Sequence, residues 1–192
     1  MVYWLLRTIL EATNAPYDIV KGLHFGKAIL NTEYEIPDGR LRIRAGQSIL
    51  TEVPLHHNKP DVMVQILTRD PQTLLFEVSV PHLQNYRTQE GIKRVKYTKN
   101  SMVDINHRNY KTISRDTNLA DQLAHLHRCK VKLGLLIIGC YGEVLNTEEH
   151  RKFQGLMQTL GVPNYKTQRL LNNATYSVFT QTTQILMKHL RE

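Results

Sequence analysis

Residues 61–80 most strongly constrain the fold of this chain, because they contain two apolar runs joined by a short polar segment. The first run is DVMVQIL (61–67), the second is TLLFEVSV (73–80), and TRDPQ (68–72) lies between them. Runs of this length on either side of a Pro-containing turn predict an antiparallel β-hairpin. Alternation along the second run places Leu74, Phe76, Val78 and Val80 on one face, and Leu75, Glu77 and Ser79 on the other.

The rest of the chain adds another hairpin, a further strand and several helices. Ala28–Ile36 and Leu41–Ile49 flank the turn sequence Pro37-Asp38-Gly39, which predicts the upstream hairpin. Val131–Ile138 is apolar enough for a strand buried on both faces. Within roughly the first 20 residues, a short helix is predicted before a break at Asn14-Ala15-Pro16. A second helix is predicted over Arg87–Lys99, with Ile92 and Val95 as its packed residues. Three more helices are predicted over 118–128, with Thr117 or Asn118 as the N-cap, over Thr147–Leu160 and over Tyr165–Leu190. This order predicts an α/β (α+β) fold, with a mixed central sheet flanked by helices.

Composition and charge narrow the classes of partner. The 192 residues include 25 Lys+Arg and 17 Asp+Glu, and the net charge of +8 favours polyanions, nucleic acid before acidic membranes. No run approaches the roughly 18 apolar residues of a membrane-spanning helix, and Met1–Leu10 does not have the pattern of a signal peptide. Two cysteines are too few for a disulfide framework or a paired-cysteine zinc site. We therefore expect an intracellular protein without a membrane partner.

Two acidic residues and a basic helix form the candidate catalytic site. Asp61 and Glu77 are expected near one another on neighbouring strands, where two carboxylates are unfavourable unless a cation lies between them. Carboxylate oxygens select Mg²⁺ or Mn²⁺, and Lys93 or Lys96 in the following helix would contact a phosphate and help to deprotonate the attacking water. The alternative is structural, since Pro-Asp is a common turn and strand glutamates usually face solvent. The apolar context LLFEVSV favours a functional Glu77.

Four motifs in the right order carry a resemblance to a known family. They are Lys59-Pro60-Asp61, Glu77 in a strand ending at Pro81, Lys93-x-x-Lys96-Tyr97, and LIIGCYGEV at 136–144. Over Arg42 to Val162 the sequence resembles the restriction-like endonuclease domain at the C-terminus of site-specific non-LTR retrotransposon polyproteins. The chain departs from the simplest motif at Ser79, where lysine would stand, so the lysine role moves to the helix, as in that family.

The resemblance implies a PD-(D/E)xK, restriction-endonuclease-like fold that nicks target DNA to prime reverse transcription. It implies a nuclease core over residues 25–162, preceded by a helical segment, 1–24, and followed by a helical extension, 163–192. Its partners would be DNA, element RNA and the reverse-transcriptase domain of a parent polyprotein, and the active protein would work in the nucleus. The Tyr-x-Asp-Asp signature of reverse transcriptase and the Cys-Cys-His-Cys knuckle are absent, which indicates a fragment, an isolated domain or a degenerate copy.

Further residues are candidates for metal or nucleic-acid contacts. Glu52, nine residues before Asp61, is a possible third acidic group at the metal. Phosphate or base contacts are expected from Lys59, Arg87, Arg94, Tyr97 and Lys99. Metal ligation by His56 with His57 is disfavoured, because adjacent strand residues point to opposite faces. Two rival hypotheses remain: a catalytically inactive, truncated nucleic-acid-binding or interaction module, and a protein unrelated to nucleic acid whose acid pair is structural.

Overall fold

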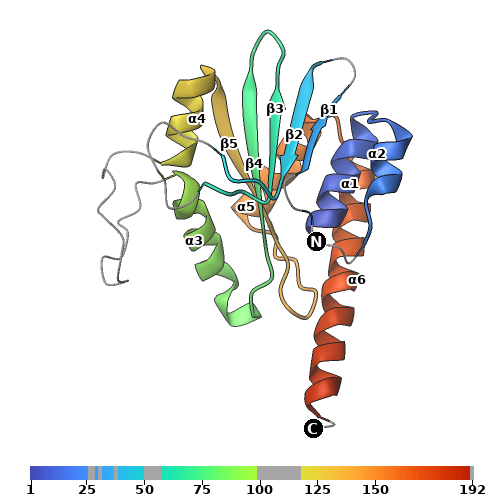
Figure 1. The fold of residues 1–192 in the computed structure, drawn as a ribbon. Helices are drawn as coiled ribbons and strands as arrows, with labels where there is room; N and C mark the ends of the chain where they lie inside the picture. The colour runs from blue at the N-terminus through green and yellow to red at the C-terminus, as the bar shows by residue number, and fades with distance from the viewer. Residues whose placement is uncertain (26–28, 30–31, 37–38, 50–57, 99–117, 191–192) are drawn as a thin grey trace. The chain divides into compact units, whose positions relative to one another are not determined.

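The computed structural model describes residues 1–25, 29, 32–36, 39–49, 58–98 and 118–190 (Figure 1). The helices are α1 (Val2–Ala12), α2 (Tyr17–Gly22), η1 (Leu83–Asn85), α3 (Tyr86–Thr98), α4 (Leu119–His127), α5 (Glu148–Thr159) and α6 (Asn164–His189). The strands are β1 (Thr32–Glu35), β2 (Leu41–Ala45), β3 (Val62–Ile66), β4 (Gln72–Ser79) and β5 (Lys130–Ile137). Within these described ranges, no helix has the length and apolar character needed to cross a membrane.

The strands form one five-stranded sheet in the order β1-β2-β3-β4-β5 (Figure 1). The first three pairings are antiparallel, so both predicted hairpins are confirmed. Lys130 donates its backbone N–H to Pro71, and Ile138 donates to Ser79. Because these bonds advance in the same direction along both segments, β5 runs parallel to β4. The sheet is therefore mixed, as predicted, whereas the restriction-endonuclease-like arrangement stays a prediction.

The β3–β4 register determines which side chains share a face of the sheet. Val62 is paired with Phe76 and Met63 with Leu75. Paired residues point to the same side, so Met63 and Leu75 lie together on one face. Helices α3 and α4 pack on this face through a buried cluster of Ile49, Met63, Leu75, Tyr97, Leu119 and Leu123. This packing fixes α3 against the strand that carries Glu77.

Side-chain caps begin two helices where the sequence predicts them. The Asn118 side chain accepts a hydrogen bond from the Asp121 backbone N–H at the start of α4. The Thr147 hydroxyl does the same for the His150 N–H at the start of α5. These bonds satisfy backbone donors that the first turn of a helix leaves unpaired. Helix α5 ends before Gly161, whose φ of +76° is readily adopted by glycine.

The chain forms two compact units. Unit 1 comprises Met1–Ala28, Val78–Glu90 and Gly134–Glu192, and unit 2 comprises Ile29–Glu77 and Gly91–Leu133. In unit 1, α1 packs on α6 with Leu5, Leu6, Ile9 and Leu10 fully buried. In unit 2, α3 and α4 cover the sheet face described above. The predicted domain division at residues 24 and 162 stays a prediction.

Three sequence predictions differ from the structure in detail. The N-terminal helix ends at Ala12, just before the predicted break at Asn14-Ala15-Pro16, where Asn14 has a φ of +55°; the difference is the separate helix α2, which follows Pro16 and was not predicted. Ile92 does not pack α3, because its side chain is 52% exposed and the buried residues of the helix are tyrosines. Strand β5 is buried only in its second half, because the lysines that alternate in its first half are exposed.

Candidate active site

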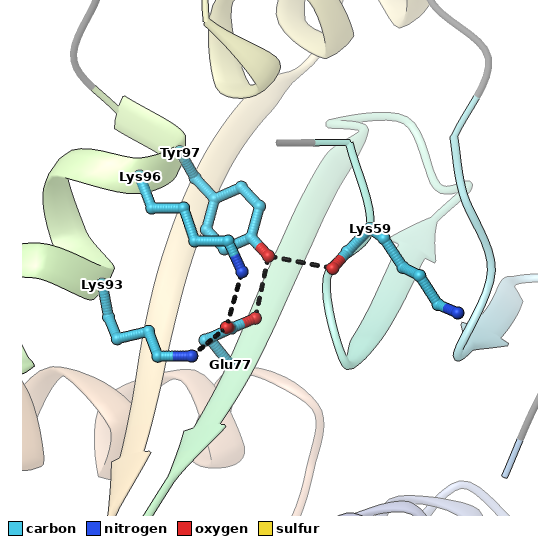
Figure 2. Close-up of polar contacts among 5 residues, drawn as sticks. All are labelled: Lys59, Glu77, Lys93, Lys96 and Tyr97. Carbon is cyan, nitrogen blue, oxygen red and sulfur yellow. Dashed lines mark hydrogen bonds and ion pairs between the residues drawn. The ribbon is translucent and has the colours of Figure 1, made fainter. Parts of the chain in front are cut away.

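The candidate site is centred on Glu77, a buried carboxylate near the end of β4. Only 3% of its surface is exposed, and burial of an unpaired charge there would cost several kcal/mol (~5). Its Oε1 accepts hydrogen bonds from Lys93 Nζ at 2.5 Å and Lys96 Nζ at 2.9 Å (Figure 2). The charge is therefore compensated from α3, and Glu77, Lys93, Lys96 and Tyr97 are called the Glu77 cluster below.

Helix α3 presents the three partners of Glu77 on one face. Lys93 is three residues before Lys96 and four before Tyr97, the spacing at which helical side chains are neighbours. The lysine side chains keep 21% and 23% exposure, so both ammonium groups can also reach water. Lys96 Nζ lies 4.6 Å from the centroid of the Tyr97 ring, within the range of a cation–π contact.

Tyr97 ties the strand and the Lys59-Pro60-Asp61 motif together. Its ring is fully buried, and its hydroxyl lies 2.9 Å from both Glu77 Oε2 and the backbone carbonyl oxygen of Lys59 (Figure 2). A phenol has one hydrogen to donate, so these two acceptors share it. Because the Tyr97 ring is buried, it has no exposed face for base stacking in this structure, and its predicted nucleic-acid contact stays a prediction.

Asp61 is the residue before β3, and the β3–β4 register determines where its backbone lies relative to Glu77. Val62 pairs with Phe76, so one further antiparallel step brings Asp61 level with Glu77. The Gly46 backbone N–H donates to the Asp61 carbonyl oxygen at 3.1 Å, which continues the β2–β3 ladder to this residue. Directly opposed residues share a face, with Cβ atoms about 5 Å apart. The backbone of Asp61 therefore lies one step beyond the last β3–β4 pair, and the convergence of the two carboxylates stays a prediction.

Electrostatics keep Glu77 ionised and Tyr97 protonated. Burial favours a higher pKa for Glu77, but the hydrogen bonds from Lys93 and Lys96 outweigh it and lower the pKa below the ordinary value. Burial raises the pKa of Tyr97 far above its ordinary value, and the charges of Glu77 and Asp61 raise it further. The phenol therefore acts as a hydrogen-bond donor between groups rich in negative charge.

The remaining predicted contact residues lie outside this cluster or outside the described chain. Lys59 contributes its carbonyl oxygen, while its side chain points away from Glu77 (Figure 2). Arg87 and Arg94 are exposed residues of α3. Glu52 and Lys99 lie outside the described residues, as do His56 and His57. Of the predicted catalytic residues in the described chain, Glu77, Lys93 and Lys96 are thus in contact with one another, and Asp61 is adjacent to them in the strand register.

The donor chemistry of Asp61 and Glu77 fits a hard divalent cation. Mg²⁺ is commonly held by one or two carboxylates, with waters and substrate phosphate oxygens as its other ligands. The two lone pairs of Glu77 Oε1 are used by Lys93 and Lys96, whereas Oε2 keeps one lone pair beside the bond from Tyr97, so Oε2 is the atom that could bind a cation. Among the described residues, no group of three or more His, Cys, Asp or Glu side chains is placed to hold a metal. The candidate donor set is therefore a carboxylate pair.

Comparisons with protein-family models, curated proteins and solved structures give no match to this chain. The resemblance to a retrotransposon nuclease domain therefore stays a prediction based on the four sequence motifs. The geometry around Glu77 supplies the independent physical grounds for a function.

Proposed function

We propose that this chain is a metal-dependent DNA endonuclease domain of the type found in non-LTR retrotransposon polyproteins. The observation that supports it is a buried glutamate that accepts hydrogen bonds from two lysines and a tyrosine. A purely structural glutamate needs only enough partners to satisfy its charge. Here, two ammonium groups that could bind a phosphate meet at one carboxylate, and the strand register predicts Asp61 as the second carboxylate for a cation, a set of groups that suits phosphodiester hydrolysis.

Bound to Asp61 and Glu77, Mg²⁺ or Mn²⁺ would supply Lewis-acid charge at the phosphodiester. The lysines provide positive charge from the protein itself. Because both ammonium groups are partly exposed, either can exchange the Glu77 oxygen for a phosphate oxygen of DNA. Lys93 or Lys96 then stabilises the negative charge that develops as water attacks phosphorus. Tyr97 keeps Glu77 and the Lys59 carbonyl in place during this exchange.

Nicking of supercoiled plasmid tests the proposal. The purified chain is expected to convert supercoiled DNA to the open-circular form with Mg²⁺ or Mn²⁺, and EDTA is expected to stop it. Asp61→Asn and Lys93→Met should each reduce the rate at least about 100-fold, the scale of a lost catalytic group. Asp70→Asn and Lys130→Met are matched controls, because their ion pair joins the β3–β4 turn to the start of β5 and both side chains are about 70% exposed. Equal nicking by Asp61→Asn and wild type would overturn the proposal.

A non-catalytic nucleic-acid-binding module is the second candidate. The observation in its favour is that Lys93, Lys96 and Tyr97 already satisfy Glu77 within the protein. This candidate predicts a folded wild-type chain that binds DNA and cleaves it with neither metal. It also predicts that Asp61→Asn leaves DNA affinity unchanged. Metal-dependent nicking by the wild type that is lost in Asp61→Asn would exclude it.

The biological setting follows from the first proposal. A nicking domain of this type would act on chromosomal target DNA in the nucleus, beside the reverse-transcriptase domain of its polyprotein and the element RNA. The net charge of +8 supports polyanionic partners of either kind. Loss of plasmid nicking when the chain is tested in nuclear ionic conditions would argue against this setting.

A further inference from the structure

Unit 1 contains a cleft of about 320 Å³ between α1 and α6, called the α1–α6 cleft below. The two helices are antiparallel and are held at both ends of the cleft. Trp4 Nε1 donates to Ser177 Oγ at 2.9 Å, and Lys166 Nζ donates to the Glu11 carbonyl oxygen at 3.4 Å. Figure 1 shows the two helices side by side. The cleft is thus a property of one well-packed helix pair.

The charges in the cleft favour an anion. Arg7, Lys166 and Arg169 line it together with one acidic residue, Glu11. Glu11 is already paired, because Arg7 Nε lies 2.7 Å from its Oε1. Arg169 is exposed and has no ion pair or hydrogen bond within the described part of the chain. Lys166 has only a long bond to a carbonyl oxygen. Two cations are therefore available to a phosphate.

Aromatic rings lie in the same cleft as these cations. Tyr165 is 68% exposed, and Trp4 is half-buried. The Trp4 ring packs against the rings of Tyr3 and Phe25, whose centroids lie 4.9 and 5.6 Å from its own. Exposed aromatic rings beside basic side chains are the means by which proteins bind single-stranded nucleic acid, since unpaired bases stack on the rings.

We propose that the α1–α6 cleft binds a single-stranded nucleic-acid segment, with a phosphate on Arg169 and Lys166 and bases on Tyr165 and Trp4. An acidic peptide would use the cations but would leave the rings without a matching partner. A duplex keeps its bases stacked inside the helix, so it would use the cations alone. This site goes beyond the proposed nuclease function, because it involves none of the residues of the Glu77 cluster.

The protein carries its own reporter for this site, since Trp4 is the only tryptophan in the chain. Titration of the full chain with a short single-stranded oligothymidylate is expected to quench Trp4 emission saturably as a base stacks in the cleft. Arg169→Ala combined with Lys166→Ala should weaken binding at least about tenfold. In the double variant, the slope of log K against the logarithm of the salt concentration should also become less negative by about 1.4, or roughly 0.7 for each lost phosphate contact.

Two further variants make the titration specific. Tyr165→Ser removes an exposed ring, and it should weaken binding about tenfold because a base stacks there. Lys188→Ala is the matched control, because it removes a cation from the last turn of the same helix, outside the cleft. That variant should retain wild-type quenching within about twofold. Circular dichroism spectra of all variants that match the wild type show that the fold is intact.

Three outcomes would overturn the proposal. The oligonucleotide could bind, as measured by fluorescence anisotropy, without quenching Trp4. Quenching could persist unchanged in the double variant. Polyglutamate could quench as effectively as the oligonucleotide, which would assign the cleft to an acidic peptide. Asp61→Asn should quench as the wild type does, so failure of this site and failure of the proposed nuclease are measured separately.

Discussion

Two groups of ion pairs in unit 2 use the same charges in opposite environments. On the β1–β2 hairpin, N–O distances are 3.2–3.6 Å and the paired side chains are 30–60% exposed. These hairpin ion pairs are formed by Glu33, Glu35, Arg42 and Arg44. In the Glu77 cluster, the distances are 2.5 and 2.9 Å, and the carboxylate is 3% exposed. Exposure to solvent, more than the number of charges, is therefore the main difference between the hairpin ion pairs and the ion pairs of the Glu77 cluster.

The difference has a physical cause in desolvation. Exposed pairs compete with water and contribute about 0–1 kcal/mol to stability. A buried carboxylate has lost its water, so removal of one partner leaves an uncompensated charge that costs about 3–5 kcal/mol. Such a cluster is retained in a protein either because the structure cannot tolerate its loss or because the site uses it. The first three predictions below test the buried group, and the fourth tests the exposed one.

The largest effect is expected from Glu77→Ala. This change leaves two half-buried lysines and the Tyr97 hydroxyl without their acceptor, and should lower the free energy of unfolding by about 3 kcal/mol. Urea denaturation followed by circular dichroism measures the loss. A loss below about 1 kcal/mol would mean that water already compensates the lysines, and the contrast with the hairpin ion pairs would disappear.

The next effect is a pH dependence that Glu77 should impose on stability. Its pKa is lower in the folded chain than in the unfolded chain, because Lys93 and Lys96 hydrogen-bond to the ionised form. The stabilisation is therefore complete above the unfolded pKa of about 4.5 and is lost as pH falls through the lower folded pKa. Denaturant unfolding gives the free energy of unfolding of wild type and Glu77→Gln between pH 7 and pH 3. Plotted against pH, the two free energies should converge as the pH falls. Parallel curves would contradict the assigned direction.

A smaller effect is expected from Tyr97→Phe. The ring stays in the core, but Glu77 Oε2 and the Lys59 carbonyl lose their shared donor, at a cost of about 1–1.5 kcal/mol. If Tyr97 positions the site, plasmid nicking should fall while DNA affinity stays at the wild-type value. Reduced affinity with unchanged nicking per bound chain would instead indicate direct DNA contact.

The smallest effect is expected from Glu33→Gln on the hairpin. Its pairs with Arg42 and Arg44 are exposed, so the free energy of unfolding should change by less than about 0.5 kcal/mol. The same urea titration used for Glu77→Ala measures it, in low and high salt. A loss approaching that of Glu77→Ala would show that exposure is not what distinguishes the two groups.

The sequence predicts the local elements well because local chemistry determines them. Alternation and turn residues were enough for both hairpins, and Asn118 and Thr147 have side chains that cap helices. Apolar periodicity predicts Ile92 as a packed residue of α3, and this is wrong, because Ile92 is exposed. The candidate site predicts that lysines of the same helix lie beside Glu77, and Lys93 and Lys96 do bond to its carboxylate.

The sequence predicts which lysines lie beside Glu77, but it does not predict the full geometry of the candidate site. The turn length predicts Asp61 near Glu77, and the observed register ends one step before that pair. The bond from Tyr97 to the Lys59 carbonyl joins residues 38 positions apart, and no local pattern encodes it. Such long-range hydrogen bonds depend on how the helix packs against the strand, and this packing cannot be predicted from local sequence patterns.

The acceptor on Lys59 is a main-chain oxygen, and this has a consequence for how the position tolerates substitution. Every amino acid has the same backbone carbonyl, so the hydrogen bond from Tyr97 can form with any residue type at position 59. In a library with all amino acids at position 59, selection for folding alone should therefore retain many residue types there. The same library selected for DNA contact would retain lysine or arginine there. Comparing the two selections would separate the architectural contribution of residue 59 from its ionic one.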